Sequence, residues 1–345
     1  MPDQPFFCYV LGLRTRFRGI TERQGMAWRG AAGWAEWSPF LDYGGRELVP
    51  WLRAADEAAE RGWPAPLRSA IAVNSTIPAV GPEEAYTIAA AAGCRTAKVK
   101  VAERGRSLAE DAERLEAVRD ALGPAGKIRI DANGGWSVDE ALHAIRRLVR
   151  FDLEYAEQPC GTVEELADLR RRLARAGVNV LVAADESIRR AEDPYQVARK
   201  EAADIAVLKV QPLGGVRACL QIAERIGLPV VVSSALETSI GIRAGLALAA
   251  ALPELPYACG LNTVALLTGD LVTEPLLAVN GVIRLRDPVV DESALERYRC
   301  NSQVQQFWQA RLVQTRELAL RQAQDDALRQ AQDGALRQAQ DDAGG

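Results

Sequence analysis

Charged residues stand at the ends of four successive apolar segments of the chain. Intervals of 26, 28 and 24 residues separate Asp131 in KIRID, Glu157 in LEYAEQP, Asp185 in VLVAADES and Lys209 in IAVLKV. One strand, one helix and two short loops occupy about that length, so each residue is expected where a strand of one βα unit ends. The carboxyl ends of parallel strands share one rim, which predicts that these four side chains lie close together.

The segment AKVKV adds two amines to this rim. Lys100 precedes Asp131 by 31 residues, and Lys98 lies two positions earlier, so the alternation of a strand points both lysines to the same side. Three carboxylates between lysines suit a divalent metal ion that holds a substrate carboxylate, with an amine beside it to move a proton. Each residue alone is equally well explained as a charge on the rim or as a helix cap, and it is the regular spacing that favours a site.

Alternation of strands and helices defines the fold class from residue 67 onward. Eight short β-rich runs alternate with helical stretches rich in alanine and arginine: RSAIAVNST, TAKVKV, KIRID, FDLEYAEQ, VLVAADES, DIAVLKV, PVVVSSAL and YACGLN. Ser107 with Glu110, and Ser137 with Glu140, have the spacing of capping boxes at helix starts, and Gly123 fits the end of the first of these helices. Crossover helices and eight strands favour a closed α/β barrel over an open doubly wound sheet.

The chain divides into three predicted parts. Residues 1–66 are expected to form a small α+β unit, with hairpin arms GMAWRG and AGWAEWSPF and a helix ELVPWLRAADEAAERG that ends at Gly62, together with contributions from about 285–318. The barrel is expected over residues 67–284. The tail, residues 319–345, carries ALRQAQDD, ALRQAQDG and ALRQAQDD in succession and is expected to be a solvated helix or a disordered appendage.

Composition restricts the class of protein. The 345 residues are 48% hydrophobic and 26% charged, with a formal charge of −4, and the arginines are scattered along helices. We therefore expect an ordinary globular protein without a nucleic-acid partner. No apolar stretch approaches the length of a membrane span, and the N-terminus lacks the features of a signal peptide. The six cysteines are far apart, which predicts reduced thiols in a cytoplasmic protein. The sequence leaves the oligomeric state open, and a monomer is one of the possibilities.

An ordered set of motifs resembles a known family. KVK, DANGGW, EQP, ADES and LKVQPLGG occur in that order on successive predicted strands, and the chain resembles the muconate-lactonising subgroup of the enolase superfamily over residues 6 to about 300. The resemblance implies a modified (β/α)7β barrel under an α+β capping domain, with a bound Mg²⁺ ion. GWAEWSPF and SSALETSIG are most similar to members that dehydrate 2-succinyl-6-hydroxy-2,4-cyclohexadiene-1-carboxylate to 2-succinylbenzoate, a dicarboxylate, in menaquinone biosynthesis.

The same resemblance implies roles for the charged residues. Asp131, Glu157 and Asp185 would be the metal ligands. Lys100 would be the base that removes a proton next to the substrate carboxylate and later returns it to the departing hydroxyl. Lys209 would be the cation that stabilises the intermediate from the opposite wall.

Neighbouring residues are expected to support these roles. Lys98 would bind the substrate or support a residue that does. Asn133 would orient a ligand or a metal-bound water, although the NGG sequence is also typical of a turn. Glu186 would partner a lysine. Ser233 and Ser234, which end the seventh strand, would bind a carboxylate or the succinyl arm, or would be ordinary buried serines.

Two further positions concern substrate choice. Gly260 and Asn262 stand where related dipeptide epimerases carry an acidic pair for an ammonium group, which argues against an amino-group substrate. Arg18, in an arginine-rich loop of the predicted cap, is a candidate to meet a dianionic substrate. Two alternatives to dehydration stay open: racemisation of N-succinylamino acids or a related racemase or cycloisomerase reaction, and a non-catalytic barrel that serves as a scaffold.

Overall fold

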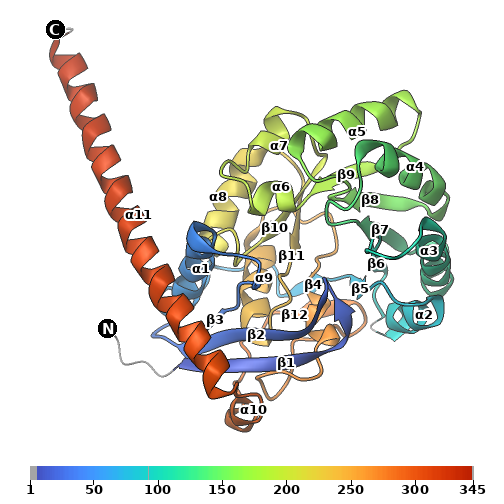
Figure 1. The fold of residues 1–345 in the computed structure, drawn as a ribbon, viewed down its shortest axis with the longest axis horizontal. Coiled ribbons are helices and arrows are strands. Elements are labelled where there is room, and N and C mark those ends of the chain that lie inside the picture. Colours follow the sequence, from blue (N-terminus) through green and yellow to red (C-terminus); the bar gives the residue numbers. More distant parts are fainter. Residues whose placement is uncertain (1–5, 92, 344–345) are drawn as a thin grey trace.

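The computed structural model describes residues 6–91 and 93–343, so residues 1–5 of the predicted cap and residues 344–345 of the predicted tail lie outside the described residues. Two β-sheets dominate the structure, a three-stranded antiparallel sheet and a seven-stranded parallel sheet, and helices lie outside the curved parallel sheet (Figure 1). The charged residues singled out above belong to the parallel sheet and its loops.

The antiparallel sheet is built from the first strands of the chain. It has the order β1 (Phe6–Phe17), β2 (Ile20–Arg29) and β3 (Trp34–Trp37), and the two predicted hairpin arms are confirmed as β2 and β3. After the short 3-10 helix η1 (Gly45–Glu47) comes α1 (Leu48–Glu60), whose last turn is closed by Gly62 at a positive φ of 59°. Buried aromatic side chains, among them Trp37 and Trp51, pack between this sheet and its helices.

The parallel sheet has consecutive strands as neighbours. Its members are β5 (Ser75–Ile77), β6 (Thr96–Lys100), β7 (Lys127–Asp131), β8 (Leu153–Glu157), β9 (Leu181–Ala184), β10 (Ile205–Lys209) and β11 (Val230–Ser233). Each neighbouring pair is parallel and in sequence order, as expected for a barrel built from βα units. Six of the eight predicted runs, from TAKVKV to PVVVSSAL, are each confirmed as one strand of this sheet.

The first and eighth runs differ from the prediction of eight regular strands. RSAIAVNST is divided, because Ala70–Ala72 forms β4 and pairs antiparallel with β12 (Val282–Arg284), while β5 begins only at Ser75. YACGLN makes two isolated bridges, Val73 with Cys259 and Ser233 with Gly260, too few for a regular strand. These bridges join the last strand of the sheet to the segment before the first, so the run still closes the barrel.

Helices connect the strands on the outside of the barrel. The longer ones are α2 (Pro82–Ala91), α3 (Leu108–Leu122), α4 (Val138–Leu148), α5 (Val163–Arg175), α8 (Val216–Ile226) and α9 (Ser239–Ala251). Short elements are η2 (Val149–Phe151), α6 (Glu186–Arg189), α7 (Gln196–Arg199) and η3 (Asn262–Leu266). Both predicted capping boxes are present, and Thr162 with Glu165 forms a third at the start of α5.

The C-terminal segment returns to the antiparallel sheet. After α10 (Glu292–Arg297), the Cys300 amide donates to the Cys8 carbonyl, and α11 (Ser302–Ala343) begins beside β1. Trp308 of α11 meets Trp37 edge-on, with ring centres 5.5 Å apart. Figure 1 shows α11 passing α1 and then extending away from the rest of the molecule, and the three repeats lie in this extension.

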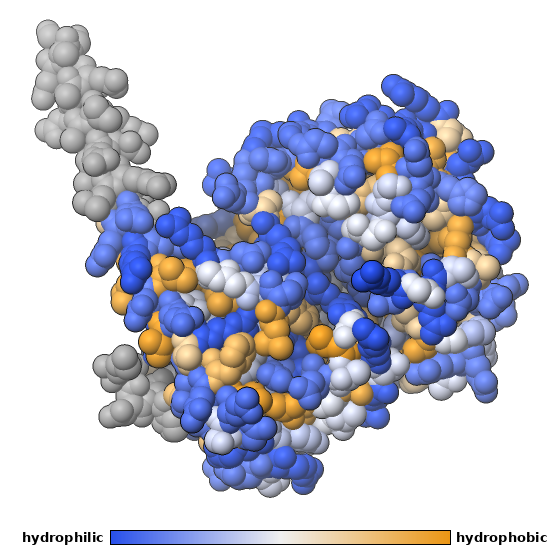
Figure 2. Space-filling model, viewed as in Figure 1, coloured by the Kyte–Doolittle hydropathy of each residue, from blue (hydrophilic) through white to orange (hydrophobic). Residues whose placement is uncertain are grey.

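Hydrophilic side chains cover most of the face shown in Figure 2, and the hydrophobic side chains there form separate patches. Within the described residues, no helix combines the length and the apolar character needed to span a membrane. All six cysteines fall within the described chain, where they are buried and form no disulfide.

Candidate active site

Six charged side chains meet at the carboxyl ends of the parallel strands. Lys98 and Lys100 come from β6, Asp131 ends β7, Glu157 ends β8, Asp185 follows β9, and Lys209 ends β10. The ladders hold Lys100 opposite Asp131 and Asp131 opposite Glu157. All six residues are at most 7% exposed, so opposite charges gather where water screens them little.

Each carboxylate of this group has a lysine partner. Lys98 Nζ lies 2.6 Å from Glu157 Oε1 and 3.3 Å from Asp131 Oδ2. Lys100 Nζ lies 2.5 Å from the same Asp131 oxygen, and Lys209 Nζ lies 2.6 Å from Asp185 Oδ2. The amines and the acids therefore form two groups of ion pairs, one that joins Lys98 and Lys100 to Asp131 and Glu157, and one that joins Lys209 to Asp185.

Asp131 and Lys98 carry the most strongly stabilised charges of the network. Burial alone would favour their neutral forms, but the positive charges of Lys100 and Lys98 outweigh it and hold the pKa of Asp131 far below its usual range. In the same way, Glu157 and Asp131 outweigh the burial of Lys98 and raise the pKa of this lysine. Both groups are charged at neutral pH.

At Glu157 and Asp185, the charges of the lysines do not outweigh the effect of burial. Burial raises the pKa of Glu157 to about 7. The charge of Lys98 opposes this shift, and the charges of Asp131 and Asp185 add to it. Burial raises the pKa of Asp185 to about 6, and burial also lowers the pKa of Lys209 although Asp185 opposes this shift. Burial thus disfavours the charged forms of Glu157 and Asp185, and a cation placed between these acids would favour their ionised forms.

The acids have the chemistry of a divalent metal site, although their oxygens now face lysines. Within residues 6–91 and 93–343, no group of three or more acidic, cysteine or histidine side chains is already arranged to hold an ion. Glu157 Oε2, however, is buried and has no hydrogen-bond partner among the described residues. A buried oxygen without a partner is costly, and an all-oxygen ligand set suits hard cations such as Mg²⁺. The residues therefore fit such an ion once the lysines turn aside.

Asn133 and Glu186 extend the network. Asn133 has a left-handed backbone, with φ at 48°, and its Oδ1 accepts from Lys100 Nζ at 2.5 Å. Its Nδ2 donates to Glu186 Oε1 at 3.1 Å. Glu186 was expected to partner a lysine. Its charged partner in the structure is instead Arg189, whose Nη2 donates to Glu186 Oε1 at 2.6 Å. Asn133 is thus both a turn residue and a hydrogen-bond partner of the predicted base.

Four of the five residues that the sequence linked to substrate binding or substrate choice line one cavity with the lysines. The fifth, Asn262, is not among its lining residues, and its Oδ1 accepts from the Ala278 amide at 2.9 Å. Ser233, Ser234, Gly260 and Arg18 surround the cavity together with Phe17, Phe40, Thr76 and Thr263. A Cβ on Gly260 would lie 2.5 Å from Ser233 Oγ and 3.2 Å from Ser233 Cβ, so a larger residue there would require Ser233 to shift. Ser234 Oγ shares a hydrogen bond of 2.7 Å with Thr263.

The cavity is small as it stands. Its volume of about 30 Å³ holds no more than about two or three water molecules, so a dicarboxylate enters only if side chains move. The cap supplies one wall of the cavity. Phe17 and Arg18 lie at the tip of the β1–β2 hairpin, and the Arg18 guanidinium stacks on the Phe40 ring at 4.5 Å.

Several buried charged residues near the site were missed by the sequence analysis. Arg189 contacts Asp185 from four residues further on, a helical spacing that could have revealed it. Arg129 lies two residues before Asp131, on the same face of β7, and pairs with Glu154 below the network. Phe40 ends the GWAEWSPF motif, but its place in the cavity depends on how the cap packs on the barrel and was not predicted.

A buried carboxylate joins the cap to the barrel. Glu36 of β3 accepts hydrogen bonds from Tyr9 Oη and Ser38 Oγ, both at 2.7 Å. It also accepts from the backbone amides of Thr238, at 3.1 Å, and Gly241, at 3.0 Å, at the start of α9. A negative charge at a helix N-terminus is favourable, so Glu36 fixes this helix and the loop that precedes it to the cap.

Glu237 lies in the same junction and predicts a pH dependence of stability. Burial, with the adjacent charge of Glu36, raises the pKa of Glu237 from 4.5 to about 7. The folded protein then binds a proton more tightly than the unfolded chain, so the free energy of unfolding falls as pH rises from about 4.5 through 7, by roughly 3 kcal/mol. Urea unfolding between pH 5 and pH 8 should show this fall, and Glu237→Gln should reduce it to the part that Glu157 and Asp185 contribute. An unchanged slope in the variant would contradict the assignment.

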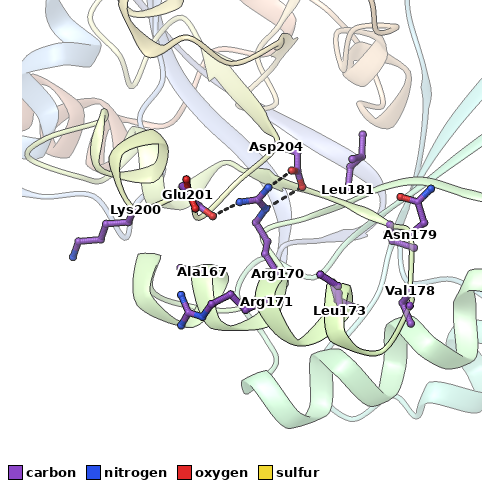
Figure 3. A pocket seen from close by; sticks show the side chains of 13 residues that line it. Ala167, Arg170, Arg171, Leu173, Val178, Asn179, Leu181, Lys200, Glu201 and Asp204 are labelled. Atoms are coloured by element: carbon purple, nitrogen blue, oxygen red, sulfur yellow. Dashed lines mark hydrogen bonds and ion pairs between the residues drawn. The ribbon is translucent and has the colours of Figure 1, made fainter.

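A second cavity, of about 540 Å³, lies at the other end of the barrel, between α5 and the segments that lead into β9 and β10 (Figure 3). Arg170 crosses it and is already paired with Asp204. None of the predicted site residues lines it, so the chemistry of this chain is concentrated at the carboxyl ends of the strands.

Comparison with known families agrees with this arrangement. A model described as "Enolase C-terminal domain-like" matches residues 82–289, and one described as "Enolase N-terminal domain-like" matches residues 8–59. Among solved structures, a muconate lactonizing enzyme from Pseudomonas fluorescens is similar with a TM-score of 0.73 and 21% identity, covering 86% of this chain and 98% of that one. An N-succinyl Arg/Lys racemase from Bacillus cereus has a TM-score of 0.71 and 20% identity, covering 86% and 97%. Fold and site thus define a capped barrel of the enolase type.

Curated relatives are more specific. An o-succinylbenzoate synthase of Thermobifida fusca is 62% identical over 308 residues, which are 89% of this chain and 95% of the relative. Another o-succinylbenzoate synthase, of Mycolicibacterium smegmatis, is 51% identical over 301 residues, which are 87% of this chain and 91% of the relative. The chain therefore belongs to the o-succinylbenzoate synthase family of the enolase superfamily.

Proposed function

We propose that this enzyme dehydrates 2-succinyl-6-hydroxy-2,4-cyclohexadiene-1-carboxylate to 2-succinylbenzoate, with Lys100 as the proton carrier. The observation that carries the proposal is the common cavity lined by Lys100 and Lys209, with buried carboxylates joined to both amines. The 62% identity to a curated o-succinylbenzoate synthase supports the same reaction.

The proposed reaction needs one proton carrier on one face of the ring. Lys100 Nζ removes the proton from the carbon next to the ring carboxylate, and the same ammonium then gives a proton to the departing hydroxyl. The C–H and C–O bonds break, water leaves, and the ring becomes aromatic. Asn133 Oδ1, at 2.5 Å, orients Lys100 Nζ, while Lys209 presents a positive charge to the developing negative charge.

We further propose that Asp131, Glu157 and Asp185 hold a Mg²⁺ ion, which supplies positive charge for the substrate carboxylate as the neighbouring proton is lost. The unpaired Glu157 oxygen and the all-oxygen ligand set support this assignment. We place the reaction in menaquinone biosynthesis, with a small dicarboxylate as the substrate. The absence of disulfides among the six described cysteines fits a cytoplasmic enzyme.

Turnover should depend on a divalent ion. Incubation with the cyclohexadiene substrate and Mg²⁺, followed by absorbance, should show conversion that EDTA reduces to the uncatalysed rate and that excess Mg²⁺ restores. A lack of turnover with Mg²⁺ would favour the scaffold alternative, and turnover that resists EDTA would overturn the metal assignment. Circular dichroism with and without EDTA serves as the control for folding.

A second candidate reaction is the racemisation of N-succinylamino acids. It needs a base on each face of the substrate, and both Lys100 and Lys209 line the cavity, which is the observation that favours it. The low pKa of Lys209, caused by its burial, suits a second base. Gly260 and Asn262, in place of an acidic pair, argue against a substrate with a free ammonium group but allow an N-succinyl amide.

A further inference from the structure

Arg189 joins the acidic cluster of the site to the cap. Its Nε donates to Asp185 Oδ1 at 2.9 Å, and its Nη2 donates to Glu186 Oε1 at 2.6 Å. Its Nη1 donates to the hydroxyl of Tyr43, which lies in the cap segment between β3 and α1. Three different donors of one guanidinium thus reach three different partners.

The contacts of Arg189 with Asp185 and with Tyr43 are buried. The side chains of Arg189 and Asp185 are 2% and 0% exposed, and Tyr43 is buried against the Trp51 ring, with ring centres 5.1 Å apart. Arg311 of α11 donates to the Tyr43 carbonyl at 2.8 Å and fixes the same cap segment from the other side. The position of Arg189 is therefore determined jointly by the barrel and by the cap.

Each carboxylate oxygen of Asp185 has its own partner. Lys209 contacts Oδ2 from the cavity side, whereas Arg189 contacts Oδ1 from the cap side. When Lys209 turns toward a substrate, Arg189 still fixes the orientation of the carboxylate. Only a guanidinium has the fork of donors that can reach Asp185, Glu186 and Tyr43 together, because a lysine ammonium acts from a single point.

Arg190 provides an internal comparison. It follows Arg189 in the chain and also reaches the cap, with Asp42 and Glu47 each at 3.2 Å and its guanidinium over the Tyr43 ring at 4.3 Å. Its side chain is 34% exposed, and its ion-pair partners are cap residues rather than the acids of the site. Exposed pairs of this kind contribute little.

We propose that Arg189 is a positioning residue that sets Asp185 for ion binding and, through Tyr43, makes the affinity for the ion depend on how the cap is docked. The inference rests on the proposed metal site and deepens it, because it assigns the orientation of one ligand to a residue of α6 and to a tyrosine of the cap.

Ion binding without substrate tests the inference. Calorimetric titration with Mn²⁺ should show about 10- to 100-fold weaker binding for Arg189→Lys. This variant keeps the positive charge but loses the separate donors that reach Asp185, Glu186 and Tyr43. Tyr43→Phe, which removes only the hydroxyl, should weaken binding by about 2- to 10-fold. The matched control Arg190→Lys should bind within about 2-fold of the wild type. At saturating metal, Arg189→Lys should regain most of its kcat, which a general loss of structure would not allow.

The outcomes separate the alternatives. Equal affinity of Arg189→Lys and the wild type would overturn the inference, as would equal weakening in Arg189→Lys and Arg190→Lys, since that would reflect general loosening of the cap. If Arg189→Lys does not fold, Tyr43→Phe decides, and unchanged affinity in it overturns the link to the cap. A wild type that binds no Mn²⁺ would overturn this inference together with the metal site. A wild type that binds Mn²⁺ but does not turn over the substrate would overturn the proposed reaction alone.

Discussion

Lys100→Met should lower kcat for the dehydration by about 10²- to 10⁴-fold, the usual contribution of a positioned proton carrier. The reason is geometric, because Lys100 Nζ lines the cavity between Asp131 Oδ2 and Asn133 Oδ1, both at 2.5 Å, and methionine keeps the apolar stem without the amine. The rate is measured by absorbance at saturating substrate and Mg²⁺.

Lys127→Met is the matched control, because Lys127 is an exposed lysine at the opposite end of the neighbouring strand β7 and should leave kcat unchanged. Mn²⁺ binding should survive in Lys100→Met, since the three acids remain. A variant that retains more than about a tenth of the wild-type kcat would contradict the role of Lys100 as the proton carrier.

Lys209→Arg should separate dehydration from racemisation. Arginine stays protonated at any working pH, so it can keep the positive charge opposite Lys100 but cannot accept a proton. Racemisation of an N-succinylamino acid should fall by about 10²-fold or more, whereas dehydration should keep a larger share of its rate. Both activities are measured on the same preparation, by optical rotation and by absorbance.

Lys209→Met completes this comparison, because it removes the charge as well. We expect both activities to fall in this variant. Equal losses of dehydration and racemisation in Lys209→Arg would mean that the shape of the ammonium group matters more than its charge, and would contradict the assignment of Lys209 as a cation in the dehydration.

The rim of charged residues was predictable because it follows from chain geometry alone. Asp131 and Glu157 each end a strand, and parallel pairing of β7 with β8 leaves them opposite each other. Spacing in the sequence carries that information directly, as alternation does for Lys98 and Lys100. The capping boxes were predictable for the same reason, since a box is a contact over three residues.

The connections between the cap and the barrel were not predictable in this way. Glu36 and Thr238 are 202 residues apart, and Arg189 and Tyr43 are 146 residues apart. Such contacts depend on how two folded units pack, which leaves no period in the sequence. The irregular closure of the barrel at Gly260 was not predicted either, because a single bridge to Ser233 stands there in place of a regular strand.

The long C-terminal helix separates two kinds of sequence. Its contacts with the cap come from side chains such as Trp308, Arg311 and Leu312, and they extend to Ala319, the first residue of the three eight-residue units. One unit adds about 12 Å to a helix. Gain or loss of a unit would therefore alter the reach of the helix without changing the residues that line the cavity of the site.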